Sequence, residues 1–423
     1  MSLSSSFYTA LSGLDTHTMA MQVVGDNISN LNTVGYKGSS ILFEDVLGSS
    51  MATVTGVDQT GVGVKVSSID GNFTQGSMQT TGVDTDVGIT GKGFFIVNDA
   101  SINAEYYTRA GHFSLDSDGY YVNPQGFRVQ GYLYDSTGTN LIESLADIQL
   151  GQRAMAAPQV TSTASISLNL DATETAIATG WNIANPAGTS NYSTAVSIYD
   201  PLGEAHQVQV YFTKTAPQTW TWNAVLDGSD VQGGTAGTPS LYGTGNLAFN
   251  AATGQLTTAM PANFYTGAIT FANGLAASAT TLNFTGTTQF GTASAIQNIS
   301  QNGYTAGNLS GVAISEDGTI SGVYTNGTTQ RIAQLVLADF INLNGLVREG
   351  SQLYSATTDS GVPLYNRPGL GGVGAISSSM LEESNIDLAA EFIKMMIDQR
   401  GFQANSKVIS TTDEMMATLI SIK

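Results

Sequence analysis

The chain contains 423 residues, of which 41% are hydrophobic and only 11% are charged, with 48 glycines and no cysteine. Its formal net charge of -19 argues against nucleic-acid binding, because a phosphate-binding surface needs clustered lysine and arginine. The lack of cysteine excludes disulfides and thiolate metal sites. Frequent glycine, together with recurring alternation of apolar residues, predicts a folded protein rich in β-structure and turns.

The N-terminal segment lacks the features of a cleaved secretory signal. It begins Met1-Ser2-Leu3 without a cationic start, and neither a continuous apolar core nor a small-residue cleavage site follows. No run approaches the roughly 18 uninterrupted apolar residues that a membrane-spanning helix needs. We therefore expect no membrane insertion, and a protein that is either cytoplasmic or exported by a route that retains its N-terminus.

Residues 4–31 predict an amphipathic helix. The segment contains no proline, and apolar residues recur along it at alternating steps of three and four residues. This spacing places one apolar stripe along a helix, which is the geometry of packing against another helix. The apolar members of this predicted stripe are Phe7, Leu11, Leu14, Met21 and Ile28.

The C-terminal segment, from Asn385 onward, repeats this pattern more strongly. Ser384 followed three residues later by Asp387 resembles a helix-capping box. Beyond it, only Gly401 interrupts residues that favour a helix. The apolar stripe of this second predicted helix consists of Leu388, Phe392, Met395, Phe402, Ile409, Met416 and Ile420.

Each predicted helix is a poor coiled coil by itself, because polar residues such as Thr18, Gln399 and Asp413 interrupt both stripes. Two arrangements would cover the stripes. Either the helices pair with each other within one chain, or they associate repeatedly with the helices of neighbouring chains. Repeated head-to-tail association produces an open helical filament when its rotation does not close, and a stripe at each end of a long chain favours this second arrangement.

Between the two helices the pattern changes to the two-residue period of β-strands. Strand meanders broken by glycine turns are predicted at 106–134 and 312–340. Lys214 is the only basic residue between Arg153 and Arg331, which marks the intervening segment as a separate acidic unit. The predicted fold class is therefore α+β and mainly β, with nested, discontinuous β-domains and an α-helix at each terminus.

Four regions are predicted, with each inner region inserted in an outer one. They are a terminal helical domain at 1–31 plus 384–423, a glycine-rich connector at 32–71, a discontinuous β-domain at 72–153 plus 309–383, and an inserted β-domain at 154–308.

Several short segments resemble a known family. ALSGL at 10–14, DNISNLNTVGYK at 26–37 and DQRGFQAN at 398–405 are similar to the terminal signatures of bacterial flagellar axial proteins of the rod and hook family. Interior segments, YDPLGEAH at 199–206, FTGTTQF at 284–290 and GTISGVYTNG at 318–327, resemble the hook subunits of that family. The residues that carry the terminal signatures are Asp26, Asn27, Asn30, Gly35, Lys37, Gln399, Arg400, Gln403, Ala404 and Asn405.

The resemblance implies a homopolymer of many copies, a curved hollow helical tube that acts as a universal joint and transmits torque from rod to filament. The terminal helices would form a coiled-coil-like inner wall, with inter-subunit seams along the two stripes, and the β-domains would form middle and outer layers. Implied partners are the distal rod protein, the hook cap, the hook-length control protein, the hook–filament junction protein and the flagellar type III export apparatus. The implied location is extracellular, in the flagellar hook and basal body, after export without a cleaved signal peptide.

Two alternatives stay open at this point. A distal-rod or hook–filament junction protein shares the terminal signatures, and an exported β-rich adhesin would not need an apolar stripe at each end. An enzyme is not expected, because His17, His112 and His206 are scattered over three predicted units and each favours a structural role. GLGGVG at 369–374 matches a nucleotide-binding pattern but opens no predicted helix, so we expect a loop. No cofactor or metal site is predicted.

Overall fold

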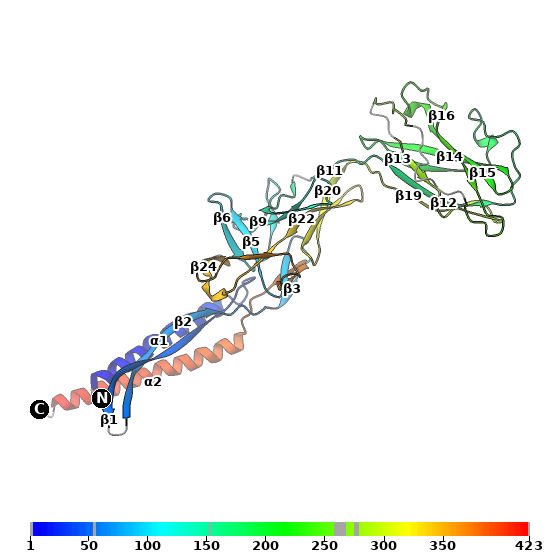
Figure 1. Ribbon diagram of the computed structural model, residues 1–423. Coiled ribbons are helices and arrows are strands. Elements are labelled where there is room, and N and C mark those ends of the chain that lie inside the picture. Colours follow the sequence, from blue (N-terminus) through cyan, green and yellow to red (C-terminus); the bar gives the residue numbers. More distant parts are fainter. Residues whose placement is uncertain (1–2, 54–55, 152–153, 258–267, 275–278, 422–423) are drawn as a thin grey trace. The chain divides into compact units, whose positions relative to one another are not determined.

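The computed structural model describes residues 3–53, 56–151, 154–257, 268–274 and 279–421. The chain divides into two compact units, each described by itself below: unit 1 comprises 1–153, 310–323 and 329–423, and unit 2 comprises 154–309 and 324–328. The fold class is α+β and mainly β with a helix near each terminus, as predicted (Figure 1). The four-region division given above is finer than this two-unit division and stays a prediction.

Two long helices in unit 1, α1 (Leu3–Ser29) and α2 (Leu388–Ser421), pack against each other (Figure 1). The capping box predicted at the start of α2, with its cap at Ser384, is wrong by about one turn. Asp387 caps the helix instead, because its Oδ1 accepts hydrogen bonds from the backbone N–H groups of Ala389 and Ala390 at 2.8 and 3.3 Å.

The segment after α1 forms a β-hairpin. Its strands, β1 (Ser39–Thr53) and β2 (Gly56–Gly71), run antiparallel, and three register shifts interrupt their pairing. Both strands contact α1. The predicted connector region at 32–71 therefore contains a regular element that lies beside the helix pair.

The β part of unit 1 is built on an antiparallel sheet with β5 near its centre. The path β21-β22-β9-β5-β6-β25-β24 is hydrogen-bonded throughout, with β10 on β9, β8 joining β7 to β9, and β23 joining β5 to β26. The strands are β5 (Phe94–Asp99), β6 (Ala104–Thr108), β7 (Ser114–Leu115), β8 (Tyr121–Val122), β9 (Arg128–Tyr134), β10 (Leu141–Asp147), β20 (Gly307–Ile314), β21 (Thr319–Tyr324), β22 (Thr329–Leu335), β23 (Leu337–Asp339), β24 (Val347–Gly350), β25 (Leu353–Ser355) and β26 (Leu364–Asn366), with a 3-10 turn η4 (Leu343–Gly345).

Side chains of β5 alternate between two apolar cores, which is why this run carries apolar residues without a break. Phe95 and Val97 belong to one core, and Phe94 and Ile96 belong to the other. Two short pairs complete unit 1, β4 (Val87–Thr90) with β27 (Ala375–Ser378) and β3 (Met78–Thr80) with β28 (Met380–Glu382). The glycine-rich motif at 369–374 lies in the loop between β26 and β27, as predicted.

Unit 2 is a β-sandwich. One sheet has the order β13-β14-β15-β16, and in the other β12 pairs with β17, β18 and β19. The elements are β11 (Met155–Ala156), β12 (Thr163–Asp171), η2 (Ala187–Thr189), β13 (Tyr192–Tyr199), β14 (Ala205–Ala216), β15 (Thr219–Asp227), η3 (Gly228–Asp230), β16 (Pro239–Ala248), β17 (Thr281–Asn283), β18 (Thr288–Phe290) and β19 (Ala295–Gln301).

Both sheets of unit 2 contribute to one apolar core. Ile166 and Leu168 of β12 meet Trp220 and Trp222 of β15, and all four side chains are fully buried. Burial alternates along β13 and β14 because successive side chains point to opposite faces of a strand. This apolar core lets the sandwich fold without help from another chain.

Candidate assembly interface

The contact between α1 and α2 uses small side chains, which let the helices approach closely. The buried residues of α1, which packs against both α2 and the hairpin, are Ala10, Gly13, Thr16, Ala20, Val24 and Asn27. A Cβ atom at Gly13 would lie 2.7 Å from Nδ2 of Asn405, and a Cβ atom at Gly401 would overlap the ring of His17. Glycine at these two positions therefore sets the separation of the helices.

Polar pairs across the two helices fix their register. Nδ1 of His17 lies 3.0 Å from Oδ1 of Asp398, and Nδ2 of Asn27 donates to Oε2 of Glu391 at 3.2 Å. Asn27, Glu391 and Asp398 are each at least nine-tenths buried. A buried polar group is stable only in the register that supplies its partner, so these pairs select one alignment of the helices.

The structure thus pairs the helices within one chain, the first of the two arrangements weighed above, but the contact is not centred on the predicted stripes. On α1 the predicted Phe7 and Leu11 are exposed, and Leu14, Met21 and Ile28 are half-buried beside the contact. The physical reason is size: alanine and glycine allow a closer helix contact than the larger residues next to them.

On α2 the same displacement occurs. Met395, Phe402 and Ile409 are half-buried, whereas four other members of the predicted stripe, Leu388, Phe392, Met416 and Ile420, are exposed. A second line of residues alternates with Met395, Phe402 and Ile409 on the contact face, and it consists of Glu391, Asp398, Asn405 and Thr412. Each of these four residues comes one position before the residue that the predicted spacing places on the stripe. This line is polar, so a search for apolar periodicity passes over it.

Further exposed apolar residues, which the sequence pattern did not indicate, lie on the helices and on the hairpin. They are Tyr8, Met19, Ile393, Met396, Ile397, Val408 and Met415 on the helices, and Leu42, Phe43, Leu47, Val62 and Ile69 on the hairpin. The short apolar runs ILF at 41–43 and VL at 46–47 are the signal that would have indicated the members of this group on the first strand of the hairpin. Large exposed apolar side chains on neighbouring elements are typical of surfaces that are buried against another molecule.

The signature segment at 26–37 joins α1 to the hairpin. Asn27 is 1% exposed, and its Oδ1 accepts from the backbone N–H of Ser39 at 2.9 Å while its Nδ2 donates to the Ser39 carbonyl at 2.8 Å. Asp26 accepts hydrogen bonds from Asn30 and from the hydroxyl of Tyr36, each at 3.0 Å. The segment is therefore a hydrogen-bonded corner.

A buried charge cluster links this corner to the β part of unit 1. Nζ of Lys37 lies 2.6 Å from Oε1 of Glu382, and Nη1 of Arg109 lies 3.1 Å from Oε2 of the same carboxylate. Lys37 and Glu382 are fully buried, and Arg109 is nearly so. Burial lowers the pKa values of Lys37 and Arg109, and the Glu382 carboxylate opposes both shifts. From the sequence, Lys37 is recognisable only as a signature residue.

Gly35 sits where no other residue fits. Its φ is +69°, its N–H donates to the Glu382 carbonyl at 2.7 Å, and a Cβ atom there would lie 2.5 Å from the backbone nitrogen of Ala110. A left-handed backbone and this close approach both require glycine. The remaining C-terminal signature residues, Gln399, Arg400, Gln403 and Ala404, are exposed on α2, and Asn405 packs on Gly13.

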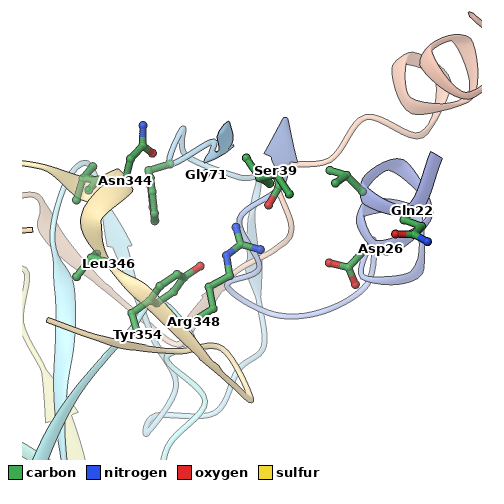
Figure 2. Close-up of a pocket in the computed structure, with 12 residues that line it drawn as sticks. Gln22, Asp26, Ser39, Gly71, Asn344, Leu346, Arg348 and Tyr354 are labelled. Carbon is green, nitrogen blue, oxygen red and sulfur yellow. The ribbon is translucent and has the colours of Figure 1, made fainter. Parts of the chain in front are cut away.

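A cavity of about 400 Å³ opens between the end of α1 and the β part of unit 1 (Figure 2). Gln22 and Asp26 line it from α1, and Arg348 and Tyr354 line it from the strands opposite. The guanidinium of Arg348 donates to the Lys37 carbonyl at 2.8 Å. The residues that line this cavity include no histidine, serine–histidine pair or carboxylate pair, so it has the character of a recess between packed elements.

The structure brings no two histidines together among the residues that it describes. His17 lies on α1, His112 follows β6 with Nδ1 2.7 Å from Oδ1 of Asp86, and His206 lies on β14. Within the described residues, neither helix has the length and hydropathy needed to cross a membrane.

Family models of flagellar proteins match the chain in four places. The rod-protein model "Flagella basal body rod protein" matches residues 7–37, and "Flagellar hook protein FlgE/F/G D1 domain" matches 88–179. "Flagellar basal body protein FlaE D2 domain" matches 169–304, and "Flagellar basal body rod FlgEFG protein C-terminal" matches 377–422. These models match a chain that has paired terminal helices, a discontinuous β part and an inserted sandwich. The fold and the matches together define an axial protein of the flagellar rod and hook class.

Comparison with individual proteins narrows this class. The chain is 35% identical to the flagellar hook protein FlgE of Escherichia coli K12, over 99% of this chain and 100% of that protein. It is 34% identical to FlgE of Treponema pallidum, over 99% of both. The chain belongs to the flagellar hook protein FlgE family. A crystal structure of Helicobacter pylori FlgE2 shares the fold, with a TM-score of 0.50 and 18% identity, and covers 72% of this chain and all of that one.

Proposed function

We propose that this protein is the structural subunit of the flagellar hook and that it polymerises through the exposed apolar surface of α1, α2 and the β1–β2 hairpin. The observation that supports this most directly is that the intramolecular helix contact uses small and polar residues. Large apolar side chains such as Phe7, Leu11 and Phe392 are left exposed, at 39%, 45% and 48%. Burying such side chains against another chain is favourable by about 25 cal/mol per Å².

In this proposal the predicted stripes become the seams between subunits. The half-buried members, Leu14, Met21, Ile28, Met395, Phe402 and Ile409, lie at the edge of the intramolecular contact, and the exposed members complete the surface beside them. A neighbouring helix pair then covers the outer side of each seam. Because the contacting surface at one end of the chain differs from that at the other, repetition produces an open helical array, consistent with a hollow tube.

The proposal includes the surroundings that the hook role requires. The tube would be extracellular, part of the flagellum and continuous with the distal rod protein at one end and the hook–filament junction protein at the other. The hook cap, the hook-length control protein and the type III export apparatus would act during assembly, with export requiring no cleaved signal. No catalytic activity is part of the proposed role, and its mechanical part is to transmit torque as a universal joint.

Point substitutions on the exposed stripe test the seam directly. In the double variant Leu11→Ser/Phe392→Ser we expect polymers to be lost while the monomer keeps its thermal stability, because both side chains are exposed in the monomer. The matched control is Ile341→Ser/Val362→Ser, which removes two side chains that are 84% and 76% exposed on the β part. Sedimentation and electron microscopy of the purified protein measure the polymer. Tubes of normal length and yield from the stripe variant would overturn the proposed seam.

A further inference from the structure

A cluster of metal-ligand side chains lies on the turn between β13 and β14 of unit 2. Asp200, Glu204 and His206 each offer one ligand atom, and these atoms lie within 4.8 Å of one another. Asp200 is fully buried and His206 is 4% exposed, whereas Glu204 lies at the surface. The cluster therefore has an interior wall and an open side toward solvent.

The imidazole of His206 is the feature that needs an explanation. Within the described part of the chain neither of its ring nitrogens has a hydrogen-bond partner. Nε2 is 3.8 Å from Oδ2 of Asp200, and Nδ1 is 3.5 Å from Oδ1 of Asp230. Both distances exceed those of hydrogen bonds, and a buried ring with two unsatisfied nitrogens is unfavourable.

We propose that His206, Asp200 and Glu204 bind a divalent transition-metal ion, Zn²⁺ by preference. One neutral imidazole and two carboxylates form a donor set that Zn²⁺ accepts, with water in the remaining position. In a tetrahedral site with ligand distances of about 2.0–2.1 Å, neighbouring ligand atoms are about 3.3 Å apart. The observed 3.8 Å between Nε2 and Oδ2 exceeds that separation by about 0.5 Å, and all three ligand atoms lie within 4.8 Å of one another, so binding requires an inward movement of the ligands.

The residues around the cluster orient its ligands as a metal site requires. Asp230 lies on the Nδ1 side of the His206 ring, and a metal-bound histidine usually donates its second N–H to such a carboxylate. Phe271 stacks on the ring with centroids 4.4 Å apart and an interplanar angle of 19°. These contacts leave Nε2 directed at Asp200.

The Asp200 carboxylate is held equally firmly. Its Oδ1 accepts hydrogen bonds from the backbone N–H groups of Leu202 and Glu204 at 2.9 and 2.7 Å, and its Oδ2 accepts from Nδ2 of Asn273. The second lone pair of Oδ2 remains to meet a cation. Because the ligands come from the two ends of the β13–β14 turn, the ion would brace this turn, and the Asp230 contact would tie it to η3.

Titration of the purified full-length chain with Zn²⁺ tests the site. Calorimetry and competition with a chromogenic chelator measure the affinity and the number of ions bound. We expect one ion per chain, at least tenfold weaker binding in Glu204→Gln and His206→Gln, and a 10–100-fold loss of affinity in Asp230→Asn. Glu204 is exposed, so its substitution leaves the fold intact. Replacing Zn²⁺ by Co²⁺ should give visible absorption bands that disappear in the same variants.

The matched control is His112→Gln, which removes a histidine that is paired with Asp86 and lies in unit 1. Its affinity for Zn²⁺ should equal that of the unmodified chain. The proposal fails if the unmodified chain binds no Zn²⁺, if Glu204→Gln and His206→Gln bind it undiminished, or if His112→Gln loses binding as they do. It also fails if imidazole NMR shows both nitrogens of His206 protonated at saturating Zn²⁺, because the ring would then be an imidazolium held between Asp200 and Asp230.

Discussion

The helix pair of unit 1 and the sandwich of unit 2 place their large apolar side chains in opposite ways. The sandwich buries large apolar side chains, including Trp220 and Trp222, between two sheets. The helix pair buries mainly small and polar residues and leaves residues such as Phe392 and Ile420 exposed. An apolar interior makes a region self-sufficient, whereas an apolar exterior makes it depend on neighbouring chains.

The largest effect should come from opening the core of the sandwich. Trp222 is fully buried and its ring centroid lies 5.2 Å from that of Phe284, so Trp222→Ala should lower the unfolding free energy of unit 2 by about 3–5 kcal/mol. Urea denaturation followed by circular dichroism measures this loss. Phe290→Ala removes a side chain of the same unit that is 48% exposed, and it should cost less than about 1 kcal/mol. Equal losses would contradict the self-sufficient core.

A somewhat smaller effect should follow from breaking the buried charge cluster that ties the helix corner to the β part. Lys37→Met leaves Glu382 buried with Arg109 as its one remaining cationic partner in the cluster, which should cost about 3 kcal/mol. The control is Lys65→Met, because Lys65 pairs with Glu44 at the same 2.6 Å but at the surface. Surface pairs contribute about 0–1 kcal/mol. Similar denaturation curves for the two variants would show that burial of the cluster is unimportant.

Next in size is the effect of a side chain at Gly35. Gly35→Ala combines left-handed backbone strain with displacement of the Ala110 backbone, and together these should cost about 2–3 kcal/mol. Gly82 separates the two causes, because its φ is +72° but a Cβ atom added there would have nothing within 4 Å. Gly82→Ala should therefore cost about 1 kcal/mol. Thermal unfolding of both variants checks the difference, and equal melting temperatures would remove the close approach from the explanation.

The sequence predicted the β-structure more fully than the contact between the helices. The two-residue period between the helices predicted a mainly β fold, because this pattern arises from strands that bury one face in the chain's own interior. The sequence did not indicate the helix contact, because Gly13, Ala20 and Asp398 have small or polar side chains and do not form a stripe of large apolar residues. The sequence also did not indicate that Lys37 belongs to a buried charge cluster, because its partner Glu382 lies 345 positions away and only the fold brings the two together.

The smallest expected effect concerns the pH dependence of the helix corner. Burial, reinforced by the Asp26 carboxylate, raises the pKa of Tyr36 to about 12. The neutral phenol is thus favoured in the folded state, so its contribution to stability is complete below about pH 10 and is lost as the pH rises toward 12. Tyr36→Phe should flatten the fall in unfolding free energy across this pH range, and Asp26→Asn should shift that fall to lower pH. Because the phenol is only half-buried, solvent screening keeps the effect small. An unchanged alkaline denaturation profile in both variants would show that the corner does not hold this hydroxyl.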